Sequence, residues 1–299
     1  MVSKITYNKC MCCGSNAITK VFKCKDHTVS KEEFEIWECS NCTFRFTQNV
    51  PDEANISTYY QSAEYVSHSD TKQGFINRLY HIVRNHTLKS KQRLVQKVTK
   101  LKSGSVLDVG AGTGAFAHTM LQAGWKVTGL EPDATARANA LLNYVLKLNE
   151  LSVLHQLETN SFDAITMWHV LEHVHDLHGY LQTYLRILKS DGRLIIAVPN
   201  YTSYDAAVYK NYWAAYDVPR HLYHFSPASM QVLLQQKGFL LEAVKPMWFD
   251  SFYVSMLSEK YRNGKGNLLK AIWVGLVSNL KAVLHVGKCS SVIYIIRKK

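Results

Sequence analysis

The chain of 299 residues lacks the features that mark disordered, repetitive or membrane-spanning proteins. It contains no internal repeat and no low-complexity tract, and its apolar content of 47% argues against a disordered chain. Residues 1–9 are polar and include no apolar run of the kind that a secretory signal needs. The most apolar late stretch, 268–286, is interrupted by lysine, asparagine and histidine and is too polar to cross a bilayer. We therefore expect a cytoplasmic protein without a transmembrane segment, for which peripheral membrane contact stays open.

Acidic side chains are scarce, and the imbalance is uneven along the chain. There are 23 Asp and Glu against 35 Lys and Arg, a formal net charge of +12. Residues 101–240 carry 10 basic and 11 acidic side chains, whereas residues 1–100 carry 15 and 9, and residues 241–299 carry 10 and 3. Such basic flanks suit a nucleic acid, an anionic membrane surface or a phosphorylated small substrate. They also suit a solvated surface with no partner, so charge alone does not choose among these alternatives.

Cysteine is absent from residues 43–288, and six of the seven cysteines lie in the first 42 residues. They include two C-x-x-C pairs separated by 25 residues with strand-like runs, which is typical of a zinc ribbon. A disulfide is the less favoured use of this pattern in the cytoplasm, and four thiolates leave no open position for catalysis. The predicted ligands of a structural zinc are Cys10, Cys13, Cys39 and Cys42. Cys12 and Cys24 are left over as spare thiols, unless Cys12 competes with a neighbour for the metal.

Residues 105–114 read S-V-L-D-V-G-A-G-T-G, an apolar strand that runs into a glycine turn, with a helical pattern over 115–123. The glycines allow a tight turn and the close approach of a ligand to bare backbone. Asp108 would repel a pyrophosphate but suits the cationic S-adenosylmethionine. A second predicted strand, 125–130, ends on Glu131, which is placed to accept hydrogen bonds from ribose hydroxyls. The predicted cofactor contacts are Asp108, Gly110, Ala111, Gly112, Gly114, Glu131, Pro132, Trp168 and His169.

Strand and helix patterns alternate through the rest of the chain. Further strands are predicted over 144–148, 162–168, 192–198, from 238 onward and over 292–296, and helices over 134–142, 177–188 and 227–237. This alternation predicts an open, mostly parallel sheet with helices on both faces. Two segments stand outside it. Residues 49–100 form a connector with an aromatic cluster at Tyr59, Tyr60 and Tyr65 and apolar residues at helical spacing from Gly74 onward, and residues 249–288 form an apolar, basic and helical insertion.

Catalytic residues are expected just past the predicted strand at 162–168, the fourth in the chain, where residues 168–176 read W-H-V-L-E-H-V-H-D. One turn of helix would place His169, Glu172 and His173 on one face. A histidine beside a carboxylate can deprotonate a hydroxyl or an acidic carbon before methyl transfer. Two alternatives stay open: Glu172 and His173 only cap and orient the turn, or they bind a metal together with Asp176.

A second polar segment, D-V-P-R-H-L-Y-H-F-S-P at 217–227, follows the fifth strand and is expected at the same crevice. Arg220 is a fork for a carboxylate or phosphate, and His221 and His224 can reach the reacting groups. We expect His173 or His221 to be the general base, with Glu172 orienting it. The aromatic residues before this segment form either a lid or internal packing; they are Tyr201, Tyr204, Tyr209, Tyr212, Trp213 and Tyr216.

Together the front cysteines, V-L-D-V-G-A-G-T-G, H-V-L-E-H-V-H-D and D-V-P-R-H-L-Y-H-F resemble zinc-ribbon-bearing class I S-adenosylmethionine-dependent methyltransferases. This family is related to quinone O-methyltransferases and sugar C-methyltransferases. The resemblance implies an α/β fold with a doubly wound, mostly parallel seven-stranded sheet whose last strand is antiparallel. It implies a zinc ribbon at 1–48, a helical connector at 49–100 and a methyltransferase domain at 101–299, with an insertion at about 249–288. The expected reaction methylates an oxygen or carbon nucleophile of a small molecule.

Two other functions compete with this interpretation. The first is a nucleic-acid methyltransferase that uses the zinc module and the basic flanks as a reader. It is weakened because no N-P-P-Y or D-P-P-Y tetrad follows the fourth strand. The second is an inactive zinc-ribbon binding protein, against which the intact glycines and Glu131 argue. The acceptor, the choice between O- and C-methylation and the oligomeric state stay open.

Overall fold

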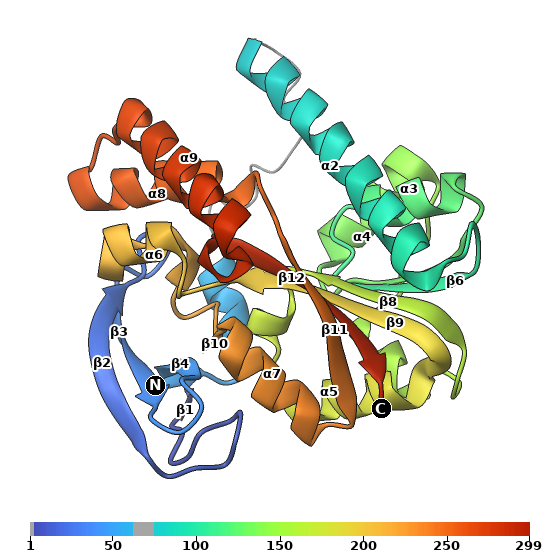
Figure 1. The fold of residues 1–299 in the computed structure, drawn as a ribbon, viewed down its shortest axis with the longest axis horizontal. Helices are drawn as coiled ribbons and strands as arrows, with labels where there is room; N and C mark the ends of the chain where they lie inside the picture. Colours follow the sequence, from blue (N-terminus) through green and yellow to red (C-terminus); the bar gives the residue numbers. More distant parts are fainter. Residues whose placement is uncertain (1–2, 62–74) are drawn as a thin grey trace.

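The larger of the two main sheets has six strands in the order β11-β12-β9-β8-β6-β7 (Figure 1). The computed structural model describes residues 3–61 and 75–299, with the backbone alone for 75–82. Five strands run parallel, and β12 is antiparallel to both β9 and β11, which confirms the orientation expected of the last strand. The strands are β6 (Ser105–Val109), β7 (Lys126–Leu130), β8 (Phe162–Trp168), β9 (Leu188–Pro199), β11 (Phe239–Pro246) and β12 (Ser291–Lys298).

Helices cover both faces of this sheet because its strands are apolar on both sides. Val106 and Ile195 pack toward α2 and α3, whereas their neighbours Leu107 and Ile196 pack toward α5 and α7. The helix α4 closes the edge beside β7. The helices are α2 (Phe75–Thr99), α3 (Ala115–Gln122), α4 (Ala134–Tyr144), α5 (Leu177–Ile187) and α7 (Pro227–Gln236). The predicted doubly wound α/β class is therefore confirmed.

The strand predicted over 144–148 is wrong, and it accounts for the missing seventh strand. The helix α4 runs through Tyr144 and ends at Val145, which has a left-handed φ of +52°. Leu146 and Leu148 are then buried against α4 and β7, and only one parallel bridge, Leu130 to Asn149, forms. The segment fills space beside the sheet, so its apolar residues mimic a strand without pairing as one.

Three strands within residues 18–48 and one short strand from 223–224 form a second, antiparallel sheet in the order β10-β4-β3-β2. We call this the front sheet; its strands are β2 (Ile18–Lys25), β3 (Glu33–Cys39), β4 (Arg45–Gln48) and β10 (Tyr223–His224). A short pair, β1 (Lys4–Ile5) with β5 (Val50–Pro51), lies beside it. Because β10 pairs with β4, the 217–227 segment belongs partly to the front sheet.

The described parts of the connector and of the insertion contain helices. The 3-10 helix η1 (Ile56–Tyr60) precedes α2, whereas Tyr65 and Gly74 of the predicted connector lie outside the described residues. The insertion folds into α8 (Asp250–Asn263) and α9 (Leu268–Leu284), which lie side by side in Figure 1.

The aromatic segment between β9 and β10 is internal packing, not a lid. It contains α6 (Tyr204–Tyr209), η4 (Lys210–Tyr212) and η5 (Ala214–Tyr216). Tyr209, Trp213 and Tyr216 are buried in one cluster with front-sheet residues and Val274 of α9. The remaining 3-10 helices are η2 (Leu151–Gln156), η3 (Leu171–His173) and η6 (Val286–Lys288).

Candidate active site

The glycine turn after β6 leaves one stretch of backbone open. Gly110, Gly112 and Gly114 have φ values of +68°, +54° and +80°, a region that disfavours side chains. A Cβ on Gly110 would collide with Cγ2 of Val170, and one on Gly114 would lie 2.9 Å from Cβ of Ala140. A Cβ on Gly112 would meet nothing within 4 Å. The first and third glycines thus serve the packing of the fold, and Gly112 leaves room for a ligand.

Glu131 lies beside this turn at the end of β7. Its Oε2 accepts the Gly112 N–H at 2.8 Å, and its Oε1 accepts the Asp133 N–H at 3.0 Å. Burial raises the pKa of Glu131, while these two donors oppose the rise. Arg137 donates to the carbonyl oxygens of Glu131 and Pro132 and so fixes the loop. Ala111 donates its N–H to the carbonyl of Leu130 at 2.9 Å, which ties the turn to β7.

Asp108 is buried inside β6, where it accepts a hydrogen bond from Oγ1 of Thr166 at 2.8 Å. Burial raises the pKa of Asp108 to about 7, although Lys91 counteracts part of the rise. Nζ of Lys91 lies 4.3 Å from the ring centroid of Trp168, and burial lowers the pKa of this lysine. Sequence reasoning missed Lys91, since it belongs to α2 and nothing around it marks a site.

His169 follows β8 in a left-handed conformation with φ of +58°. Its Nε2 lies 2.8 Å from Oδ2 of Asp250, the first residue of α8, and its Nδ1 lies 3.4 Å from Oε1 of Glu172. Burial alone would favour the neutral ring, but Asp250 and Glu172 raise the pKa of His169 to about 10. The helical turn begins later than predicted, at Leu171, and the side chains of His169 and Glu172 still meet.

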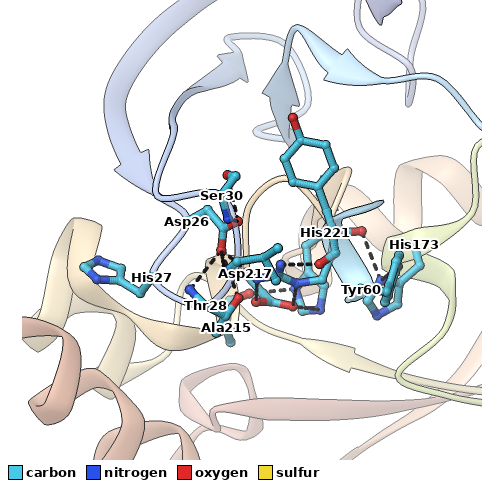
Figure 2. Close-up of polar contacts among 12 residues, drawn as sticks. Asp26, His27, Thr28, Ser30, Tyr60, His173, Ala215, Asp217 and His221 are labelled. Carbon is cyan, nitrogen blue, oxygen red and sulfur yellow. Dashed lines mark hydrogen bonds and ion pairs between the residues drawn. The ribbon is translucent and has the colours of Figure 1, made fainter. Parts of the chain in front are cut away.

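Glu172, His173 and His221 converge, and we call them the histidine cluster. One ligand atom from each lies within 4.8 Å of the others, and the two imidazole centroids are 4.5 Å apart. Nδ1 of His173 lies 3.0 Å from both the Arg220 carbonyl and the Tyr60 hydroxyl, and Nδ1 of His221 lies 2.8 Å from the Ala215 carbonyl (Figure 2). Because a carbonyl only accepts, each Nδ1 carries the proton and each Nε2 keeps its lone pair.

The charges in the histidine cluster are unequal. Burial, reinforced by the neighbouring His221, lowers the pKa of His173 to about 4, so this ring is neutral near pH 7. Burial would raise the pKa of Glu172, but His169 and His221 lower it. Among the described residues, none donates a hydrogen bond to either Glu172 oxygen. An ionised carboxylate therefore stands beside a neutral imidazole.

Two residues expected at the crevice have structural roles instead. Arg220 is buried and bonds Oδ1 of Asp26 at 3.2 Å and Oδ1 of Asp217 at 2.6 Å, so its guanidinium binds carboxylates of the protein itself and the expectation that its side chain reaches the crevice is wrong. It joins the 217–227 segment to the turn after β2, whose Thr28 and Ser30 donate to Asp26 (Figure 2).

His224 belongs to β10, and its Nε2 lies 3.0 Å from Oγ1 of Thr47 in the front sheet. Burial lowers its pKa well below the ordinary value. The expectation that His224 reaches the crevice is therefore wrong. Asp176 caps α5 by accepting the Gly179 N–H at 2.9 Å, and His221 takes the place predicted for it beside Glu172 and His173.

The four predicted zinc ligands do meet. The sulfurs of Cys10 and Cys42 are 3.5 Å apart and those of Cys13 and Cys39 are 3.6 Å apart, and all four lie within 4.8 Å of one another. A tetrahedral site with Zn–S bonds of ~2.3 Å has sulfurs about 3.8 Å apart, so the spacing fits zinc. Cys12 and Cys24 point elsewhere, to the carbonyls of Ser229 and Asn211.

Comparison with known proteins agrees with this geometry. A family model described as a methyltransferase domain matches residues 81–244, which is more than half of the chain. The chain belongs to this methyltransferase family. A ubiquinone biosynthesis O-methyltransferase of Xanthomonas oryzae pv. oryzae is 30% identical over 163 residues, which cover 50% of this chain and 68% of that protein. The mitochondrial enzyme of the same name from Homo sapiens is 28% identical over 163 residues, 49% and 44% of the two chains.

Among solved structures, magnesium protoporphyrin IX methyltransferase from Synechocystis PCC 6803, with bound S-adenosylhomocysteine, superposes with a TM-score of 0.54. It is 14% identical and covers 83% of this chain and 100% of its own, so the likeness concerns the fold. The chain is thus an S-adenosylmethionine-dependent class I methyltransferase related to the ubiquinone O-methyltransferases.

Proposed function

We propose that this methyltransferase acts on a hydroxyl oxygen of a small molecule, with the histidine cluster at the reacting oxygen. The observation that carries the proposal is the meeting of two imidazoles with Glu172: one ligand atom of each side chain lies within 4.8 Å of the others, and each Nδ1 faces a backbone carbonyl. Glu172, the first residue of the cluster, comes four residues after the end of β8. Val170, which lies between β8 and Glu172, packs against Gly110 and so joins the cluster to the glycine turn. The names of the related enzymes support oxygen as the acceptor and give no support to a nucleic acid.

The donor site fits S-adenosylmethionine. Gly112 leaves bare backbone, and Glu131 presents a buried carboxylate for ribose hydroxyls. Asp108 has a pKa of about 7, and a cationic ligand would favour its ionised form. Nε1 of Trp168 is buried and has no hydrogen-bond partner among the described residues, which leaves a donor for a ligand. The bound cofactor supplies an electrophilic methyl group on a sulfonium. We call Asp108, the glycine turn, Glu131 and Trp168 the donor half.

We propose that His173 or His221 takes the acceptor's hydroxyl proton at Nε2. The oxygen then forms a bond to the methyl carbon as the carbon–sulfur bond breaks, and the electron pair of that bond goes to sulfur. Glu172 stabilises the imidazolium that results. A protonated His169 is unsuited to be the base, and its ion pairs with Asp250 and Glu172 give it a positioning role. Alignment of the reacting atoms supplies much of the acceleration.

A transfer assay tests this function. We would incubate the full chain with methyl-labelled S-adenosylmethionine and a panel of catechols and phenols, and measure label in the organic extract. We expect methylated phenol, together with binding of S-adenosylhomocysteine in calorimetry. Tight binding of NAD without binding of S-adenosylhomocysteine would contradict the donor assignment, and label on carbon instead of oxygen would contradict the acceptor assignment.

We also propose a structural zinc on Cys10, Cys13, Cys39 and Cys42. The sulfur spacing supports it, and so does the small hydrophobic core of the front sheet, because a core of that size needs a metal or a cross-link to be stable. With it we retain the division into a zinc ribbon at 1–48, a connector at 49–100 and a methyltransferase domain at 101–299. The cytoplasmic location likewise remains a prediction.

A further inference from the structure

The outer face of α9 is apolar along its whole length. Leu269 is 81% exposed and Trp273 is 66% exposed, although apolar side chains of this size are usually buried. The exposed residues recur at helical spacing: Leu268, Leu269, Ile272, Trp273, Leu276, Leu280, Val283 and Leu284. A contiguous apolar surface of this kind marks an interaction site on a folded protein.

The opposite face of α9 fixes this orientation. Its residues are small and buried, among them Ala271, Gly275 and Ser278. A Cβ on Gly275 would lie 2.7 Å from Cδ1 of Phe252, and Oγ of Ser251 donates to the Gly275 carbonyl at 3.2 Å. Close packing against α8 therefore holds α9 with its apolar face outward.

The α8–α9 hairpin is also basic. Residues 250–288 contain six Lys and Arg against Asp250 and Glu259, and Glu259 is buried in an ion pair with Lys270. Arg262 and Lys265 are exposed at the junction of α8 and α9, and Lys288 is exposed beyond the other end of α9. Lys281 lies 4.8 Å from the ring centroid of Tyr204, on the flank of the apolar face. An apolar stripe between basic ends is the pattern of a helix that lies in the interface of an anionic membrane.

The charge also decides between a membrane and a second copy of the chain. Face-to-face dimerisation through α9 would bring together two hairpins that each carry six basic and two acidic side chains, a net charge of +4, and like charges oppose such pairing. No helix of the described residues is long and apolar enough to cross a membrane. The 17 residues of α9 would thus lie along a bilayer surface instead of spanning it.

We propose that the apolar outer face of α9, together with the basic residues at its ends, docks on the surface of an anionic lipid bilayer. The hairpin starts at Asp250, whose carboxylate bonds His169 beside the histidine cluster, so the element that docks also contributes a side chain to the crevice. If the proposed function holds, the acceptor is then a lipophilic hydroxyl compound that reaches the crevice from the bilayer. The docking itself does not depend on that function.

Vesicle flotation of the full chain tests the docking. We expect strong binding to vesicles of phosphatidylcholine with 30% phosphatidylglycerol, at least about tenfold weaker binding to phosphatidylcholine alone, and weakening by salt. The double variant L269S/W273S should lower binding to the anionic vesicles by about tenfold or more. The control variant L141S/L142S removes two exposed leucines from α4 and should bind as the wild type does.

Calorimetry with S-adenosylhomocysteine confirms that both variants are folded, and it tests the donor site separately from docking. Equal vesicle binding by the wild type and L269S/W273S would overturn the proposal. So would a wild type that binds neither vesicle. A concentration-dependent dimer that L269S/W273S abolishes, without vesicle binding, would assign the face to a second copy.

Discussion

The donor half and the histidine cluster lie side by side but are assembled in different ways. The donor half uses residues 108–168, all at the carboxyl ends of the neighbouring strands β6, β7 and β8. The histidine cluster takes Glu172 and His173 from η3 and His221 from a segment that pairs with the front sheet. One site depends on the local order of a parallel sheet, and the other depends on contacts between segments far apart in the chain.

Because of this difference, only the histidine cluster depends on the front sheet. The buried pair of Arg220 and Asp26 and the pairing of β10 with β4 tie the His221 segment to the front sheet. No such link joins the front sheet to Gly112 or Glu131 among the described residues. Perturbing the front sheet should therefore damage the histidine cluster and spare the donor half.

The largest effect is expected from removing the zinc. Structural zinc contributes about 10–16 kcal/mol of binding free energy in small zinc modules, so chelation or Cys39→Ser should unfold the front sheet. Methyl transfer should be lost with it. Binding of S-adenosylhomocysteine should stay within a factor of about two, because distant sites couple weakly. Hydrogen exchange, elemental analysis and calorimetry on the same sample measure the three outcomes.

Elemental analysis should find one zinc per chain, with Cys12→Ser as the matched control that keeps it. A metal-free protein with an ordered front sheet would contradict the prediction, as would a disulfide between Cys10 and Cys13. A second metal per chain would place a cation at the histidine cluster and would argue against a free imidazole base there.

The next effect concerns the base. Replacing the residue that takes the proton, by His173→Ala or His221→Ala, should cut turnover by roughly 10²–10⁴-fold. Binding of S-adenosylhomocysteine should be nearly unchanged in both variants, because the donor half makes its own contacts. His224→Ala is the control for a buried histidine outside the cluster. Full turnover by both variants with a genuine acceptor would rule out the mechanism.

The donor half should show the reverse behaviour. Glu131→Ala removes the predicted ribose acceptor and should weaken binding of S-adenosylhomocysteine by about 1–3 kcal/mol. The histidine cluster should keep its structure, so turnover at saturating donor should fall much less than it does in the histidine variants. Titration calorimetry and a donor-concentration series separate the two quantities. Unchanged donor affinity in Glu131→Ala would remove this residue from the donor site.

The sequence predicts the structure well where residues adjacent in the chain decide it. The glycine turn and Glu131 are predictable because each follows directly on an apolar strand, and the cysteine pairs because the spacing within each pair is local. The prediction fails for Arg220 and His224, whose partners Asp26 and Thr47 lie more than 170 residues earlier. It also fails over 144–148, where leucines that fill space look like a strand. Lys91 and Asp250 went unnoticed because only the tertiary fold brings them to the site.

The smallest expected effect concerns His169, which lies between the donor half and the histidine cluster. Its folded-state pKa of about 10 exceeds the unfolded value of about 6.5, so its contribution to stability is complete below pH 6.5 and is lost as pH rises toward 10. Between pH 7 and pH 9 the free energy of unfolding of the wild type should fall by on the order of 1–2 kcal/mol more than that of His169→Gln. This value is smaller than the pKa shift alone would give, because the ring is partly exposed to solvent. Denaturant unfolding of both proteins across this range measures the difference. Parallel stability curves would mean that the pair of His169 and Asp250 contributes nothing, and that α8 is held at the crevice by packing alone.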